Sequence, residues 1–434
     1  MENARIISKQ IFFAALRETI PGAAVRHQAG PILARYSDGN FQRLLIVGFG
    51  KVAPTMASAL AGALGDMVDT GLIITRYGHA SLSLPEMIRV FEAGHPVPDD
   101  HGLQATEEVF NLVHAADART LIITLISGGG SALLVAPQDG ISLADKQQTT
   151  SILLKAGADI FELNTVRKHL SRVKGGRLAE VAYPAKVVSL ILSDVIGDRL
   201  DVIASGPTAA DPTTYREALE VLCRYQLSER VPQPVIDLLR RGDRGELPET
   251  PKAGSPFLAG VENLIIGSNR QTLAAAARSA QELGYAVKIL ADDQAGEARE
   301  VGRQLAHQAL AALGGKPGDK RLCLLSGGET TVIVRGQGKG GRNMELALAF
   351  AMAIEGVHGI TLLSAGTDGS DGPTDAAGAI VDGSTIAKAR KLGIDPQAYL
   401  DDNNSYGFFK RCGGLLITGA TGTNVMDLQI VVLA

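Results

Sequence analysis

The stretch Leu44-Leu45-Ile46-Val47-Gly48-Phe49-Gly50-Lys51-Val52-Ala53 has the pattern of a buried strand, a tight glycine turn and the start of a helix. The apolar run Leu44–Val47 does not alternate with polar residues, which is typical of a strand covered on both faces of a parallel sheet. Backbone amides at the start of the following helix favour an anion such as a phosphate or a carboxylate. The stretch therefore predicts an α/β fold with a ligand site at this turn.

The turn also reads as GxGxxA, the weaker form of the dinucleotide-binding fingerprint, so Gly48 and Gly50 are candidate cofactor-binding residues. Arg76 stands where that fingerprint expects an acidic residue, and an arginine there suits a 2′-phosphate. Lys51, beside the turn, suits phosphoryl charge instead. The motif alone leaves dinucleotide binding, phosphate binding and a purely structural turn open.

The order of strand, glycine turn and helix recurs along the chain and predicts doubly wound parallel sheets. Strands are expected at Leu44–Val47, Gly71–Thr75, Thr120–Ile126, Lys186–Leu192, Asn263–Ile266, Ala286–Leu290, Leu322–Leu325, Thr330–Val334, Ile360–Ser364 and Leu415–Thr418. Five prolines between Gln226 and Gly260 indicate a domain boundary near residue 250, with a surface excursion inside one domain as the alternative. We therefore expect α/β domains over residues 1–250 and 251–434, with ligands in the cleft that two such domains imply.

Composition excludes several classes of protein. The 434 residues include 42 Lys and Arg and 46 Asp and Glu, and only 4% are aromatic. This composition does not indicate a surface that binds nucleic acid or an anionic membrane. Three widely spaced cysteines and no long apolar stretch fit a cytoplasmic protein. HExxH, GxSxG and Cys–His arrangements are missing, so zinc hydrolysis and acyl transfer have no support. A homodimer is the default expectation from base rates.

A second glycine loop, Ser127-Gly128-Gly129-Gly130-Ser131, follows the expected strand Thr120–Ile126. Three consecutive glycines are costly in regular structure, so they indicate backbone that approaches a ligand, with a floppy loop as the alternative. His95 lies in the loop Gly94-His95-Pro96-Val97-Pro98 and is expected to be structural rather than catalytic.

Two loops in the second half of the chain have a similar character. Gly327 and Gly328 follow an apolar run, and either a ligand loop or a hairpin turn fits them. Arg342 and Asn343 stand at a glycine-rich tip just before a helical pattern, where an arginine can stabilise transferring phosphoryl charge. A salt bridge from Arg342 to Glu345 is the structural alternative.

Acidic residues follow two of the apolar strands. Asp194 comes just after Lys186–Leu192 and is positioned for a metal or for a substrate proton, with a helix cap as the alternative. Thr367 and Asp368 lie in the glycine-rich acidic turn Gly366–Asp375. Its oxygen ligands suit Mg²⁺ carrying a nucleotide, and a solvated turn is the alternative.

Together these segments resemble the class II glycerate kinases, the glycerate 2-kinase family whose C-terminal half is the MOFRL domain. The matching segments follow the family's order from about residue 45 to residue 430 and so cover nearly the whole chain. They include VGFGKVA, AGHPVPD, ISGGGSALL, NTVRKHLSRVKGGRLA, LSDVIGD, IASGPT, SGGETTV, GKGGRNMELAL, SAGTDGSDGPTDAAGA, DNNSY and TGTNVMDL.

The resemblance implies that ATP phosphorylates D-glycerate at its 2-hydroxyl with the help of a divalent metal, here Mg²⁺. It implies two α/β domains around a deep cleft, the first Rossmann-like with a mainly parallel sheet and the second a smaller MOFRL-type domain. The family's essential lysine falls on Lys51 and its essential arginine on Arg342.

Further roles are hypotheses within that resemblance. Asp194 would orient or deprotonate the 2-hydroxyl and would share the metal with Asp368. The loop from Ser127 to Ser131 would hold the glycerate carboxylate or the transferred phosphate. The residues expected around ATP and Mg²⁺ are Gly327, Gly328, Asn343, Thr367 and Asp368.

Many members of the same family are named hydroxypyruvate reductase, and the GxGxxA turn with Arg76 would support an NAD(P)H-dependent dehydrogenase. The sequence shows no Arg, Glu and His constellation for hydride transfer, and Lys51 and the acidic turn would have no role in a reductase. We therefore expect the kinase, with the reductase as the alternative. A sugar-acid-binding regulator without catalysis is the third possibility.

Overall fold

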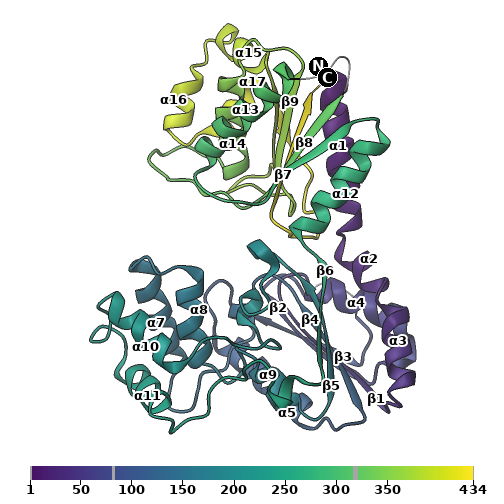
Figure 1. The fold of residues 1–434 in the computed structure, drawn as a ribbon, viewed down its shortest axis with the longest axis vertical. Coiled ribbons are helices and arrows are strands. Elements are labelled where there is room, and N and C mark those ends of the chain that lie inside the picture. The colour runs from purple at the N-terminus through teal and green to yellow at the C-terminus, as the bar shows by residue number, and fades with distance from the viewer. Residues whose placement is uncertain (1, 81–83, 316–320, 434) are drawn as a thin grey trace. The chain divides into compact units, whose positions relative to one another are not determined.

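The computed structural model describes residues 2–80, 84–315 and 321–433, which form two compact units (Figure 1). The N-terminal unit comprises residues 21–193 and 198–266, and the C-terminal unit comprises residues 1–20, 194–197 and 267–434. In the described ranges, no helix is long and apolar enough to cross a membrane.

The N-terminal unit is built on a six-stranded sheet with the order β3-β2-β1-β4-β5-β6. Its strands are β1 (Arg43–Phe49), β2 (Thr70–Arg76), β3 (Ile88–Ala93), β4 (Thr120–Ile126), β5 (Lys186–Leu192) and β6 (Val261–Gly267). The ladders that join β3 to β2, β2 to β1, β1 to β4 and β4 to β5 are all parallel. This order is that of Rossmann-type sheets, and it confirms the expected Rossmann-like fold with a mainly parallel sheet.

Helices cover this sheet because its central strands are apolar throughout. All seven residues of β4 are buried, for example, which requires a layer on each face. The helices of the unit are α2 (Pro21–Arg26), α3 (Ala29–Asp38), α4 (Ala53–Leu64), α5 (Asp100–His114), α6 (Gly130–Leu133), α7 (Leu143–Lys155), α8 (Ile160–His169), α9 (Arg177–Ala182), α10 (Tyr215–Arg224) and α11 (Gln233–Asp243). A separate apolar cluster joins α7, α8, α10 and α11, which Figure 1 shows grouped together.

The C-terminal unit has a six-stranded sheet with the order β11-β10-β9-β12-β8-β7. Its strands are β7 (Ala286–Gln294), β8 (Leu322–Gly328), β9 (Ile360–Gly366), β10 (Gly378–Asp382), β11 (Leu415–Leu416) and β12 (Asp427–Leu433). Only the β7–β8 ladder is parallel, and the other four are antiparallel. The prediction of a second doubly wound parallel sheet was therefore wrong.

The reason is β12, which lies between β8 and β9 and runs antiparallel to both. The strand expected at Thr330–Val334 is also wrong, because β7 and β12 already occupy both edges of β8. That segment makes only an isolated bridge between Thr331 and Glu297, so the hairpin considered for Gly327 and Gly328 does not form.

The helices of the C-terminal unit include one from the start of the chain. They are α1 (Glu2–Glu18), α12 (Asn269–Glu282), α13 (Ala298–Gly314), α14 (Arg342–Ala353), α15 (Thr385–Lys391), α16 (Pro396–Asp401) and α17 (Ser405–Cys412). Helix α1 buries Ile11 and Phe12 against α12 and the sheet, beside which Figure 1 shows it.

The units therefore divide differently from the expected boundary near residue 250. Strand β6 continues the first sheet up to Gly267, and α1 packs with the second sheet. Both differences have the same physical cause. Strand β6 and helix α1 are placed by apolar contacts with residues far away in the sequence, and a local run of prolines does not indicate such contacts.

Candidate active site

The two glycine loops of the N-terminal unit lie against each other, after the neighbouring strands β1 and β4. Gly50 has φ +132°, and a Cβ added there would lie 2.1 Å from Ser127 Oγ, so only glycine allows this approach. The amide of Lys51 donates to Gly128 O at 2.9 Å, and the amide of Val52 donates to Ser127 Oγ at 3.3 Å. The first loop therefore uses its amides to hold the second loop.

Lys51 and His95 converge on the second loop. A Cβ added to Gly129 would lie 2.9 Å from His95 Cδ2 and 3.4 Å from Lys51 Cε, so glycine leaves room for both side chains. Burial, followed by the nearby charges of Lys51 and Arg76, lowers the pKa of His95. In the described chain, the partly exposed amides of Gly128 and Gly129 donate no hydrogen bond. Positive charge and unused amides together make this edge suited to an anion.

Ser131 joins that loop to residues for which the sequence motifs suggested no role. Its hydroxyl lies 2.5 Å from Ser205 Oγ and accepts a hydrogen bond from Arg167 Nη2 at 2.9 Å. Ser205 Oγ donates to Asn164 Oδ1 at 2.9 Å, and Lys174 Nζ donates to Ser131 O at 2.7 Å. The dense basic stretch from Asn164 to Lys174 was the available signal, but its pattern alone does not show which cations face the loop.

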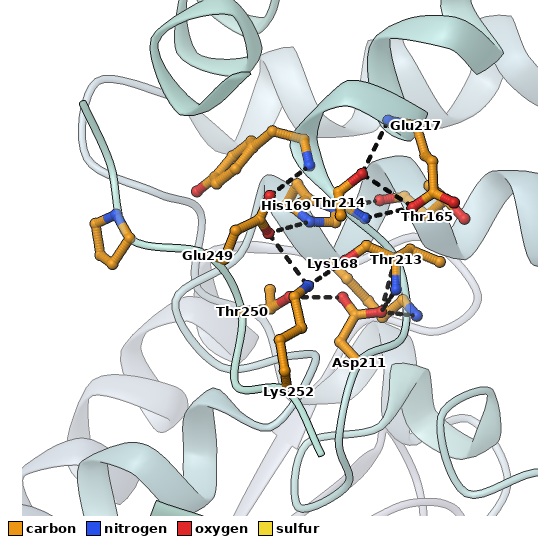
Figure 2. Close-up of polar contacts among 12 residues, drawn as sticks. Thr165, Lys168, His169, Asp211, Thr213, Thr214, Glu217, Glu249, Thr250 and Lys252 are labelled. Carbon is orange, nitrogen blue, oxygen red and sulfur yellow. Dashed lines mark hydrogen bonds and ion pairs between the residues drawn. The ribbon is translucent and has the colours of Figure 1, made fainter. Parts of the chain in front are cut away.

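Helix α8, which carries Asn164 and Arg167, is anchored by the polar network in Figure 2. Lys168 Nζ donates to Asp211 Oδ1 at 2.6 Å, and both side chains are at most 2% exposed. His169 Nε2 lies 3.1 Å from Glu249 Oε2. A buried ion pair of this kind fixes geometry strongly, because separating its partners leaves a buried charge uncompensated.

In the C-terminal unit, Arg342 begins α14 and is held by two carboxylates. Its Nε and Nη2 donate to the two oxygens of Asp427 at 2.6 and 2.9 Å, and Nη1 lies 3.0 Å from Glu329 Oε1. Burial would lower the pKa of Arg342, but the hydrogen bond and charge of Asp427 raise it above its usual value. The alternative partner Glu345 was wrong, because Glu345 instead binds Arg299 at 2.8 Å.

Asp371 caps the same helix, which the sequence did not predict. Its oxygens accept hydrogen bonds from the amides of Asn343 and Met344 at 3.1 and 2.8 Å. Burial raises the pKa of Asp371 to about 7, even though these two amides lower it. The start of α14 is therefore already occupied by a carboxyl group of the chain.

The other residues expected around ATP lie close to Arg342 in the fold, and several are buried. Thr367 Oγ1 donates to Met426 O at 2.6 Å, and Asn343 Oδ1 accepts from Ser364 Oγ at 2.7 Å. Asn343 Nδ2 is buried without a hydrogen-bond partner. Gly327 lies against a side chain, since a Cβ there would be 2.0 Å from Asn269 Oδ1.

Carboxylates gather near Arg342, although no three His, Cys, Asp or Glu side chains of the described residues are arranged to hold a metal ion on their own. Partial burial raises the pKa of Glu329 against the effect of Arg342, and Asp427, Asp194 and Asp368 raise it further. Asp194 follows β5 in sequence but belongs to the C-terminal unit. Oxygen donors of this kind fit Mg²⁺ that arrives with phosphates and keeps most of its ligands from them.

Two family models match the chain. Residues 7–240 match a domain of unknown function, DUF4147, and residues 322–427 match the MOFRL family. The chain is 44% identical to a D-glycerate 2-kinase of Thermotoga maritima, over 99% of this chain and 98% of that protein. It is 38% identical to a glycerate kinase of Rattus norvegicus, over 99% and 94%.

A third relative, from Agrobacterium vitis, is 42% identical over 99% of this chain and 95% of its own length and is named only provisionally as a hydroxypyruvate reductase. Among solved structures, a glycerate kinase of Thermotoga maritima superposes with a TM-score of 0.91 at 44% identity, covering all of both chains. These similarities span both units of the fold. The chain therefore belongs to the glycerate kinase family in which a DUF4147 domain precedes a MOFRL domain.

Proposed function

We propose that this chain transfers the γ-phosphoryl group of ATP to the 2-hydroxyl of D-glycerate, giving 2-phosphoglycerate and ADP. The full-length similarity to proteins named glycerate 2-kinase and glycerate kinase supports this activity. ATP is accordingly the phosphoryl donor, and the acceptor is a short 2-hydroxy acid.

The observation that favours the kinase over the reductase is the hydrogen bonding of the first glycine loop. A dinucleotide site of the GxGxxG type needs free amides at the start of its helix for the pyrophosphate. Here the amides of Lys51 and Val52 are used by Gly128 O and Ser127 Oγ. What the loop offers a ligand is the side chain of Lys51, which suits a phosphoryl group.

In the N-terminal unit, we assign the acceptor to the loop from Ser127 to Ser131. The unused amides of Gly128 and Gly129 would hold an anionic group of glycerate or of the transferred phosphate. Lys51 would stabilise the negative charge that spreads over the phosphoryl oxygens in the transition state. His95 lies against Gly129, and its lowered pKa makes it neutral at pH 7, which suits a hydrogen-bonding contact.

In the C-terminal unit, we assign the nucleotide to the surroundings of Arg342, which would stabilise phosphoryl charge. Asp194 would orient or deprotonate the 2-hydroxyl, and with Asp368 it would hold Mg²⁺. The metal, when bound, supplies charge neutralisation for the phosphates of ATP. The further residues of this nucleotide site would be Gly327, Gly328, Asn343 and Thr367. Gly48 and Gly50 remain predicted cofactor residues, although the structure supports a packing role for Gly50.

The test combines two assays on the purified protein. One contains D-glycerate, ATP and Mg²⁺, with ADP release followed in time and the product identified by ³¹P NMR. The other contains hydroxypyruvate with NADH or NADPH. We expect ADP and a 2-phosphoglycerate signal without nicotinamide oxidation. Nicotinamide oxidation without ADP release would overturn the kinase proposal and would indicate that the first glycine loop binds a dinucleotide.

A further inference from the structure

Three cationic side chains meet behind Ser131 in the N-terminal unit. Lys146 comes from α7, Arg167 from α8, and Lys174 from the segment that follows α8. Lys146 is 3% exposed and Lys174 is fully buried, whereas Arg167 is partly exposed. Their charges interact, since Arg167 lowers the pKa of Lys146, and both lower the pKa of Lys174. We call these three residues the cation cluster.

The cation cluster has no negative partner in the described part of the chain. Lys146 Nζ and Arg167 Nε are buried without any hydrogen-bond partner. Lys174 Nζ donates only to the carbonyls Ser131 O and Leu134 O, at 2.7 and 3.1 Å. Buried charges in proteins are normally paired or hydrogen-bonded, so three such cations together are a costly arrangement.

The same unit shows what a purely structural buried lysine looks like. Lys168, on the same helix as Arg167, is 2% exposed and lies 2.6 Å from the carboxylate of Asp211 (Figure 2). Thr213 and Thr250 also donate to that carboxylate. The chain thus provides a hydrogen-bonded carboxylate for one buried lysine, and the described residues provide none for Lys146.

The pKa shifts of the three side chains also indicate that the cluster lacks a negative partner among the described residues. Burial, with a contribution from Arg167, lowers the pKa of Lys146 to about 7, and burial lowers the pKa of Lys174 well below its usual range. Burial also lowers the pKa of Arg167 to about 10. An anion beside the cluster would offset this cost and restore the charged forms.

The partly exposed member of the cluster connects it to the second glycine loop. Arg167 Nη2 donates to Ser131 Oγ at 2.9 Å, and Ser131 stands beside the unused amides of Gly128 and Gly129. A planar guanidinium is well suited to a carboxylate because it donates two parallel hydrogen bonds. Lys146 and Lys174, being buried, would act through the field that they create at this loop.

We propose that the cation cluster is the anion site for the acceptor, in which Arg167 binds the carboxylate of a short 2-hydroxy acid at the Ser131 loop and Lys146 and Lys174 support that charge from behind. This proposal rests on the proposed function and names the part of the acceptor that the enzyme recognises. It makes Arg167 a substrate-binding residue and the two lysines positioning residues.

The test measures acceptor binding by calorimetry without ATP, using D-glycerate, glycolate and glycerol. Glycolate keeps the carboxylate and a 2-hydroxyl, whereas glycerol lacks the carboxylate. We expect D-glycerate and glycolate to bind wild type, and glycerol to bind at least about tenfold more weakly. Arg167→Gln should weaken D-glycerate at least about tenfold and Lys146→Met about threefold or more. The matched control is Lys155→Met, which replaces an exposed lysine on α7, the helix of Lys146. This variant should bind D-glycerate like wild type.

Steady-state kinetics then separates this site from the nucleotide site. Arg167→Gln and Lys146→Met should raise KM for D-glycerate while KM for ATP stays within about twofold. If instead KM for ATP rises and D-glycerate binding is unchanged, the cluster serves a phosphate of the nucleotide and the proposal is overturned. Folded variants with wild-type D-glycerate affinity would overturn it as well.

Thermal unfolding distinguishes a loss of acceptor binding from a loss of stability. Replacing an unpaired buried charge with an apolar side chain of similar length is often neutral or stabilising, so Lys146→Met should unfold at or above the wild-type temperature while binding less acceptor. A destabilised Lys146→Met with normal acceptor affinity would show a structural lysine and refute the site. Failure of the kinase proposal is distinguishable, since wild type would then bind D-glycerate without releasing ADP.

Discussion

The N-terminal and C-terminal units handle charge in opposite ways at their candidate sites. Around the glycine loops of the N-terminal unit, Lys51 lies beside Gly129 and Arg167 binds Ser131, and neither forms an ion pair with a carboxylate of any described residue. In the C-terminal unit, Arg342 is bound by Asp427 and approached by Glu329. One unit presents uncompensated positive charge, and the other presents a cation already neutralised by acids.

This difference suggests which ligand each unit can accept. An acceptor carboxylate, or a phosphoryl group, gains from the N-terminal unit without any further ion. A nucleotide polyphosphate would meet net negative charge in the C-terminal unit, since Asp368 adds to Asp427 and Glu329. It would have to bring a divalent cation with it, which is how Mg²⁺ is normally delivered to phosphoryl-transfer sites.

The largest expected effect is the loss of Lys51. Lys51→Met removes the charge beside Gly129 while keeping most of the side-chain volume, so we expect kcat to fall about 10³-fold with the fold intact. ADP release under saturating D-glycerate and ATP measures it, with Lys155→Met as the exposed control. A turnover within tenfold of wild type would contradict the proposed difference between the two units, because the N-terminal unit would then not act on the phosphoryl group.

The second prediction concerns two buried lysines of the same unit. Lys168→Met leaves the carboxylate of Asp211 buried without its ion pair and should lower the free energy of unfolding by about 3 kcal/mol. Lys146→Met should lower it little or not at all. Urea unfolding of both variants measures the difference, and the double variant Lys168→Met/Asp211→Leu should recover much of the loss. Equal destabilisation by Lys146→Met and Lys168→Met would remove the contrast between a paired and an unpaired cation.

The parts of the fold that could be predicted are those with a local signal. Continuous apolar runs identified β4 and β5 with their observed bounds, and glycine turns marked the loops that carry Lys51 and Ser127. Strand β12, by contrast, is central in the second sheet only because it inserts between β8 and β9, far from it in sequence. The run Thr330–Val334 has strand composition, but β8 has no free edge for it.

The candidate site follows the same division. Lys51 and Arg342 stand at tips of the chain that glycines mark, so their positions were predictable. The partners that determine their electrostatics were not, because Asp427 is 85 residues away from Arg342 along the chain. Arg167 lies 36 residues away from Ser131, inside a basic stretch where Lys168 is structural. Sequence patterns identify which cations exist, whereas pairing decides which of them remain available for a ligand.

A third prediction concerns Arg342, whose charge is paired with Asp427 and Glu329. Arg342→Lys keeps the charge but cannot donate the two parallel hydrogen bonds that now reach Asp427. We expect kcat to fall about 10²-fold and KM for D-glycerate to stay near its wild-type value. The exposed Arg390→Lys is the matched control. If KM for D-glycerate rises instead with kcat unchanged, Arg342 serves the acceptor, and the division of roles between the two units is wrong.

The last prediction is a pH dependence of stability that comes from Asp371 in the C-terminal unit. The pKa of Asp371 is raised to about 7 in the folded chain, chiefly by burial, against an unfolded value near 3.8. The folded state therefore binds this proton more tightly, and its stability should fall as pH rises from about 4 to about 7, by at most about 1.4 kcal/mol per pH unit. Asp371→Asn keeps an oxygen for the amides of Asn343 and Met344 but cannot ionise, so the stability difference between wild type and variant should shrink or reverse over this range. Urea midpoints measured at pH 5, 6, 7 and 8 test this, and a difference independent of pH would show that Asp371 is ionised throughout, adding one more fixed negative charge to the site of Arg342.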